Sequence, residues 1–109
     1  MVVLQPEDLD EFEKLLEDHS SRLIVVDFYA TWCGPCKIMG PKLSKMSDQM
    51  NDIVFVKVDV DENEEIVSRY PINVMPTFIF IKDGEQIDSV EGSMEEQLGR
   101  NLLLTVKNR

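Results

Sequence analysis

Three short apolar segments restrict the folds open to this chain. They are Leu23–Tyr29, Ile53–Val58 and Thr77–Ile81. Near-continuous apolar runs of this length are typical of strands that are covered on both faces of a sheet. Because helical patterns fill the intervals, the sequence predicts an α/β fold with a mixed central sheet of about five strands, flanked by about four helices.

The remaining elements follow from helix and turn signals. Val2–Leu4 is a candidate short strand, and the Asp-Gly pair within Lys82–Glu85 predicts a hairpin turn into an edge strand over Gln86–Glu91. Further helices are expected over 6–18, 33–50 and 63–70, and a capping box at Ser93–Glu96 predicts the start of a last helix. The buried stripe of that helix is expected to comprise Met94, Leu98, Leu102 and Val106.

Gly99 interrupts the last helix. A glycine inside a helix costs about 1 kcal/mol relative to alanine, which predicts that a packing constraint requires it there.

The charge composition limits the classes of partner that the protein can be expected to bind. The 109 residues predict one domain, 1–109, and the balance of 11 Lys plus Arg against 21 Asp plus Glu gives a net charge of −10. Nucleic acid and anionic membrane repel such a surface, so neither is expected as a partner, whereas a basic docking patch would suit it.

No apolar run approaches the roughly 20 residues of a membrane span. With no secretory, transit or lipidation signal visible, we expect a cytoplasmic protein in a thiol-reducing compartment.

The two cysteines of the chain both lie in one tetrapeptide, Cys33-Gly34-Pro35-Cys36. This tetrapeptide follows an apolar strand and is expected to open a helix, where free N–H groups and the helix dipole favour an anion. Cys33 is therefore the candidate nucleophilic thiolate, and Cys36 lies one turn later on the same face, ready to displace it. Gly34 leaves Cys33 accessible to a second protein, and Pro35 stiffens the ring that the two sulfurs can close.

Three other interpretations of the cysteine pair remain open. A structural disulfide would close a very short loop and gain little entropy. Half of a zinc or cluster site would need further ligands, and His19 is the only other nitrogen or sulfur ligand. Inert buried thiols are disfavoured by the helix N-terminal position.

Three further residues have functional interpretations. Asp27 lies inside an apolar strand, where a carboxyl group with a raised pKa could accept the proton of Cys36; the alternative is an aspartate that reaches solvent at a strand edge. Lys57 is either the charge that tunes Asp27 or a lysine that extends to solvent. Trp32 either shields the thiol and contacts partners or is an ordinary core aromatic.

The sequence resembles the thioredoxin family over essentially its whole length. The matching segments are Val25–Lys37, Lys57–Asp61, Met75–Phe78, Gly84 and Gly92. The resemblance implies a thioredoxin fold and a thiol–disulfide oxidoreductase that reduces protein disulfides through the redox-active pair Cys33 and Cys36. It also implies a cis Met75-Pro76 bond, with Pro76 against the disulfide, and an Asp27–Lys57 pairing. The apolar docking surface for clients would comprise Trp32, Gly34, Pro35, Met75, Pro76 and Gly92.

The resemblance further implies the electron donor and the clients. Electrons would come from NADPH through a flavin-containing thioredoxin reductase, so the domain itself would bind no cofactor and no metal. Clients would be disulfide-containing proteins of the peroxiredoxin and reductase types, and the protein would be a monomer. Two alternatives remain: an oxidase or isomerase of a secretory compartment, which the Gly-Pro dipeptide disfavours, and a non-catalytic binding subunit with the same fold.

Overall fold

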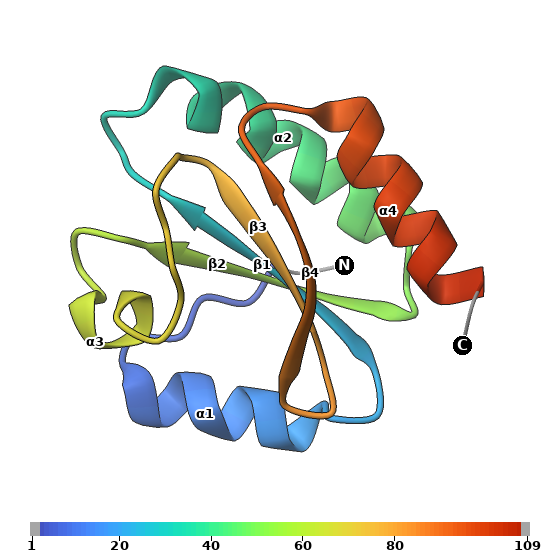
Figure 1. The fold of residues 1–109 in the computed structure, drawn as a ribbon, viewed down its shortest axis with the longest axis horizontal. Coiled ribbons are helices and arrows are strands. Elements are labelled where there is room, and N and C mark those ends of the chain that lie inside the picture. The colour runs from blue at the N-terminus through green and yellow to red at the C-terminus, as the bar shows by residue number, and fades with distance from the viewer. Residues whose placement is uncertain (1–2, 108–109) are drawn as a thin grey trace.

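The computed structural model describes residues 3–107 and contains a four-stranded mixed sheet in the order β2-β1-β3-β4 (Figure 1). Strand β1 pairs in parallel with β2 and antiparallel with β3, which pairs antiparallel with the edge strand β4. Helices connect or flank the strands, with α1 and α3 on one face and α2 and α4 on the other. The elements are α1 (Leu9–Asp18), β1 (Leu23–Tyr29), α2 (Gly34–Gln49), β2 (Ile53–Asp59), α3 (Glu64–Val67), β3 (Thr77–Lys82), β4 (Glu85–Glu91) and α4 (Glu95–Lys107).

The core lies on both faces of the sheet because successive strand residues point to opposite sides. In β1, Val25 packs beneath α2 and α4, whereas Ile24 and Val26 pack on the face that α1 and α3 cover. Every residue of β1 from Leu23 to Phe28 is buried, which confirms the central position predicted from its apolar run. Because β1 and β2 are parallel neighbours, their carboxyl ends lie side by side at one edge of the sheet.

The predicted strand at Val2–Leu4 is wrong for the residues that the structure describes. Leu4 forms a single parallel bridge to Val56, and Val2 lies outside the described residues. Pro6 lacks an N–H group to continue such pairing. Within residues 3–107, the sheet therefore has four strands, where about five were predicted.

Two helices are shorter than predicted. Helix α1 begins at Leu9 rather than Pro6, because Asp8 is the N-cap and accepts a hydrogen bond of 2.8 Å from the Glu11 N–H. Helix α3 ends at Val67, and the chain continues to Tyr70 through tighter turns in which the N–H groups of Arg69 and Tyr70 bond to carbonyls three residues back.

The last helix corrects two further predictions. Leu98 and Leu102 are buried as expected, but Met94 precedes α4 and is 53% exposed. The side chain of Val106 lies outside what the structure describes. A Cβ atom added at Gly99 would contact nothing within 4 Å, so no packing constraint requires this glycine.

Two glycines give a matched pair of stability predictions. Gly84 has φ +79° in the two-residue turn between β3 and β4, whereas Gly99 lies within α4, and neither site has a neighbour within 4 Å of an added Cβ. Gly84→Ala should lower the free energy of unfolding by about 1–2 kcal/mol through backbone strain. Gly99→Ala should raise it by about 0.5–1 kcal/mol through helix propensity. Urea denaturation measures both, and effects of the same sign would contradict these expectations.

Candidate functional site

Cys33 is the N-cap residue of α2, at the point where the chain leaves β1 and enters the helix. Its backbone is extended, with φ −87° and ψ 115°, and its Sγ accepts a 3.2 Å hydrogen bond from the Cys36 N–H. Pro35 lies in the first turn, where its missing N–H has no partner to lose. The Cys33 sulfur thus occupies the position at which a helix N-terminus stabilises negative charge.

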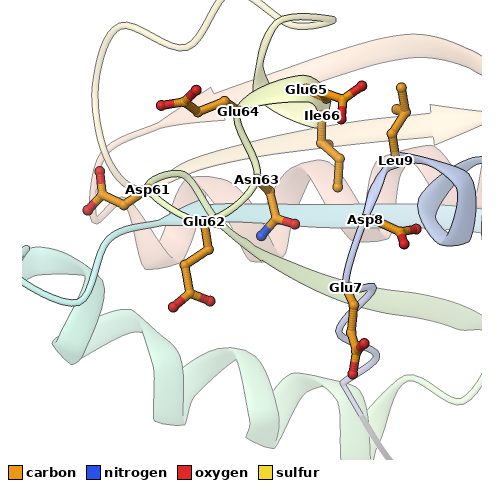
Figure 2. Close-up of a pocket in the computed structure, with 9 residues that line it drawn as sticks. All are labelled: Glu7, Asp8, Leu9, Asp61, Glu62, Asn63, Glu64, Glu65 and Ile66. Carbon is orange, nitrogen blue, oxygen red and sulfur yellow. The ribbon is translucent and has the colours of Figure 1, made fainter.

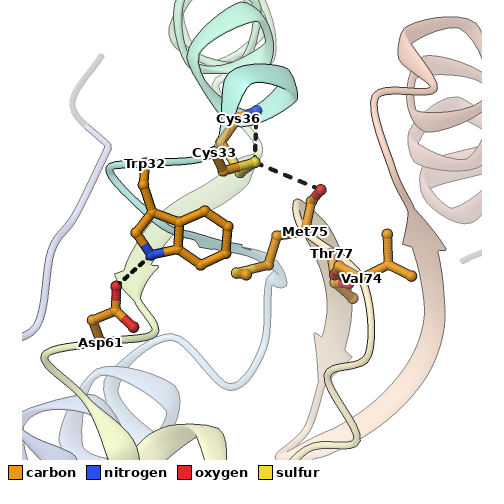
Figure 3. Close-up of a disulfide and its surroundings, with 7 residues drawn as sticks. All are labelled: Trp32, Cys33, Cys36, Asp61, Val74, Met75 and Thr77. Atoms are coloured by element: carbon orange, nitrogen blue, oxygen red, sulfur yellow. Dashed lines mark hydrogen bonds between the residues drawn. A yellow bond between two sulfur atoms is a disulfide. The ribbon is translucent and has the colours of Figure 1, made fainter.

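Cys33 and Cys36 are joined by a disulfide, with their Cα atoms 5.2 Å apart (Figure 3). Both cysteines are only 6% exposed, because they pack with Ala30 and with the partly buried Tyr29 and Met75. Cys33 is therefore less exposed than the sequence suggested. Gly34 and Pro35 are exposed beside it, so the surface on which a client would approach is open at the start of α2.

The segment before β3 lies against the disulfide. The Met75-Pro76 peptide bond is cis, as the family resemblance implied, and the Met75 carbonyl oxygen lies 3.7 Å from Cys33 Sγ (Figure 3). The Gly92 N–H donates a 2.7 Å hydrogen bond to the Pro76 carbonyl, and Gly92 itself has φ +83°. These contacts bring Met75, Pro76 and Gly92 into the same region as the start of α2.

Trp32 lies on the surface, not in the core. It is 66% exposed, and its Nε1–H donates a 2.8 Å hydrogen bond to Asp61 Oδ2 (Figure 3). Sequence reasoning did not assign Asp61 to the site. The signal was available, because Trp32 follows β1 and Asp61 follows β2, and parallel neighbours end at the same edge of a sheet.

Asp27 is 4% exposed within β1, and its Oδ1 has no hydrogen-bond partner among the residues that the structure describes. Burial raises the pKa of Asp27 from 3.8 to about 7, although the positive charge of Lys57 opposes that rise. Asp27 and Lys57 are paired in the register of β1 and β2. The alternative of an aspartate that reaches solvent is therefore wrong.

A cavity of about 260 Å³ is lined by both Asp27 and Cys36. Its lining comes from β1, the turn into α2, α2 itself and β2. The lining residues are Asp27, Tyr29, Ala30, Thr31, Cys36, Lys37, Gly40 and Lys57. The structure thus brings Asp27, Cys36 and Lys57 together around one space.

Sequence reasoning gave Tyr29 no role, yet its ring contacts this group of residues. Lys57 Nζ lies 5.9 Å from the centre of the Tyr29 ring, within the range of a cation–π contact. The contact depends on the register between two parallel strands, which the sequence alone does not reveal.

The acidic run between β2 and α3 lines a second cavity, of about 280 Å³ (Figure 2). Glu62, Glu64 and Glu65 are exposed there, as expected of a solvated loop, whereas Asp59 is buried and accepts a hydrogen bond from the Asp61 N–H. Within residues 3–107, no group of three or more His, Cys, Asp or Glu side chains is placed to hold a metal ion. His19, the candidate third ligand, is the C-cap residue of α1.

None of the helices in the described part of the chain is long and apolar enough to cross a membrane.

Comparisons with known proteins point in one direction. The family model described as "Thioredoxin" matches residues 3–103. The chain is 45% identical to thioredoxin-1 of Caenorhabditis elegans over 93 residues, which covers 85% of this chain and 81% of that protein.

Solved structures similar to this chain are also thioredoxins or come from studies of thioredoxin systems. Fasciola hepatica thioredoxin matches with a TM-score of 0.90 and 40% identity, covering 93% of this chain and 97% of that one. A chain from a study of thiol resolution in yeast mitochondrial 1-Cys peroxiredoxin via glutathione and thioredoxin systems matches with a TM-score of 0.83 and 38% identity, covering 91% and 92%. The likeness therefore extends over most of the chain.

Proposed function

The chain belongs to the thioredoxin family, and from this premise we propose a mechanism in which Cys33 attacks client disulfides and Cys36 resolves the product. Family membership and the close-spaced cysteine pair make the protein a protein-disulfide reductase, which needs no bound cofactor. The observation that carries the proposed roles is the position of Cys33 Sγ as the N-cap of α2, with the Cys36 N–H directed at it.

The first step is nucleophilic attack. In the dithiol form, Cys33 as a thiolate attacks one sulfur of a client disulfide; the client S–S bond breaks and an S–S bond to Cys33 forms. The second client sulfur leaves as a thiolate and takes up a proton from water. The N-terminus of α2 favours the thiolate because its free N–H groups and dipole stabilise negative charge.

The second step needs a base for Cys36. We assign this role to Asp27, which lines the same cavity as Cys36 and has a pKa of about 7, so that it can accept a proton near neutral pH. The Cys36 thiolate then attacks Cys33 Sγ, the mixed disulfide breaks, and the reduced client departs. Lys57 supports the step by favouring the ionised form of Asp27.

The proposed client surface surrounds the disulfide. Its members are Trp32, Gly34, Pro35, Met75, Pro76 and Gly92. The Met75 backbone, whose carbonyl lies 3.7 Å from Cys33 Sγ, would pair with an extended client segment beside the reacting sulfurs. The acidic residues beyond Trp32 would suit a client or reductase with a basic patch.

We further propose that NADPH supplies electrons through a flavin-containing thioredoxin reductase. Peroxiredoxin-type and reductase-type enzymes are the proposed clients, and the study of a yeast peroxiredoxin that includes a similar chain supports the first of these. The protein would act in the cytoplasm, since a reducing compartment suits a chain whose only two cysteines form the redox pair. It would act as a monomer and as a single domain.

Insulin reduction tests the proposed function. The protein should accelerate precipitation of insulin chains with dithiothreitol, and also with NADPH plus a thioredoxin reductase. Absence of acceleration with both donors would contradict the proposal. Acceleration with dithiothreitol alone would contradict only the proposed reductase.

Trp32→Ala tests the client surface. We expect kcat/KM for insulin to fall by about tenfold or more, because an exposed tryptophan at an interface centre is a typical binding hot spot. The rate with a small aromatic disulfide should change much less. Leu103→Ala is the matched control, since Leu103 is also exposed and lies near the far end of α2 beside Met50. Equal losses for both substrates would contradict a docking role for Trp32.

A further inference from the structure

Three side chains with polar or charged ends meet on one face of β1 and β2. Asp27 and Tyr29 are two residues apart on β1 and so point to the same side of the sheet, and Lys57 is the register partner of Asp27 on β2. All three line the cavity that also reaches Cys36. The ammonium group of Lys57 therefore has two neighbours on β1 that could fix its position.

The carboxylate is not the neighbour that holds Lys57. Among the described residues, no ion pair joins Lys57 to Asp27, and Asp27 Oδ1 has no hydrogen-bond partner. Lys57 Nζ instead lies 5.9 Å from the centre of the Tyr29 ring. Since lysine has a long side chain with several rotatable bonds, the aromatic face is what restricts where its charge lies.

The Tyr29 ring is itself held from outside the two strands. Gln5 Nε2 donates a 3.3 Å hydrogen bond to the Tyr29 hydroxyl. Gln5 is placed there because Leu4 bonds to both sides of Val56: the Leu4 N–H donates to Phe55 O at 2.8 Å, and the Lys57 N–H donates to Leu4 O at 2.9 Å. The segment before α1 thus anchors the ring.

We propose that Tyr29 is a positioning residue for the resolving step: held by Gln5, its ring keeps the Lys57 ammonium at the cavity, where it favours the ionised form of Asp27. The proposal rests on the proposed role of Asp27 as the proton acceptor for Cys36. Tyr29 packs against the cluster that contains Cys33 and Cys36, but in this scheme it takes part in no bond change and no proton transfer.

Other charged groups also surround the cavity. Lys37 of α2 also lines it and is the second cation near Asp27. Burial, and then the negative charges of Asp59, Asp27 and Glu62, raise the pKa of the Tyr29 hydroxyl, so the ring remains neutral. If the ring is removed, Lys57 is free to extend into solvent, and Asp27 loses part of its stabilising charge while remaining buried.

The test is a carbon-13 NMR titration of the Asp27 carboxyl group in the oxidised protein. Tyr29→Leu should raise its titration midpoint by about 0.3–0.7 pH unit, a two- to fivefold higher proton affinity, as befits a weak cation–π contact. Tyr29→Phe, which keeps the aromatic face but loses the hydrogen bond from Gln5, should raise the midpoint less than Tyr29→Leu does. In a Lys57→Met background, where the midpoint is already raised, Tyr29→Leu should cause no further rise.

Each other outcome contradicts the proposal. An unchanged midpoint in Tyr29→Leu, or a rise of the same size whether or not Lys57→Met is present, would reduce Tyr29 to a structural residue. A second measurement needs no variant: the Lys57 Cε protons should show an upfield ring-current shift, and its absence would overturn the contact. Because neither measurement uses a client, failure of reductase activity would be distinguishable from failure of this inference.

Discussion

Replacement of Cys33 with serine is expected to lower the rate of insulin reduction on the order of a thousandfold or more, to the uncatalysed background. A serine hydroxyl at the N-cap of α2 could accept the same hydrogen bond from the Cys36 N–H, so the fold should persist while the nucleophile is lost. Removal of a covalent nucleophile is among the largest single effects in enzyme catalysis. The measurement is the insulin assay with dithiothreitol or a reductase as donor.

Cys36→Ser is the matched variant and should fail differently. Cys33 can still attack, so a mixed disulfide with the client should accumulate and appear as an added mass that dithiothreitol removes. The double variant Cys33→Ser/Cys36→Ser should form no adduct. If adducts form through Cys36 in Cys33→Ser and not through Cys33 in Cys36→Ser, the assigned order of attack is wrong.

Asp27→Asn is expected to stabilise the protein by at least about 2 kcal/mol at pH 8 while slowing turnover. In the folded protein, the pKa of Asp27 lies near 7 rather than 3.8, so the folded state binds this proton more tightly than the unfolded state. The folding stability of the unchanged protein therefore falls as the pH rises from about 3.8 to 7. Above pH 7, ionised Asp27 lowers the free energy of unfolding by the full amount, about 4 kcal/mol. An unpartnered buried amide offsets part of the gain.

Urea denaturation between pH 4 and pH 8 measures this effect. The gain from Asp27→Asn should shrink steadily toward pH 4, where Asp27 is protonated in the folded protein. Asp52→Asn removes one negative charge at an exposed turn and controls for the net charge. A gain independent of pH, or none at pH 8, would contradict a raised pKa at Asp27.

Residue patterns predicted those parts of the fold that burial on both faces determines. The apolar runs located β1, β2 and β3 to within one residue, and Asp83-Gly84 located the hairpin. The patterns did not predict helix ends that local hydrogen bonds determine. Asp8 is the N-cap of α1, so that helix begins later than predicted, and tighter turns replace the α-helix of α3 after Val67. Met94 was misjudged because a helical stripe does not reveal where the neighbouring layer ends. Gly99 was misjudged because the propensity cost of a glycine does not reveal whether another residue approaches it.

The candidate site also has parts that the sequence predicts and parts that it does not. The cysteine tetrapeptide could be placed at a helix N-terminus from sequence because strand, turn and helix signals surround it. Its surroundings depend on chain segments far apart in sequence: Met75 against Cys33, and Lys57 against the Tyr29 ring. Those contacts depend on strand register and on the path into β3, neither of which hydrophobic periodicity encodes.

The central claim, that the helix N-terminus makes one of the two thiols the nucleophile, is tested most directly by alkylation of the reduced protein. Iodoacetamide at pH 7, followed by peptide mass spectrometry over time, gives the rate at each cysteine. We expect Cys33 to react at least about tenfold faster than Cys36, and faster than free cysteine. Equal rates at the two thiols, or a Cys33 slower than free cysteine, would contradict it.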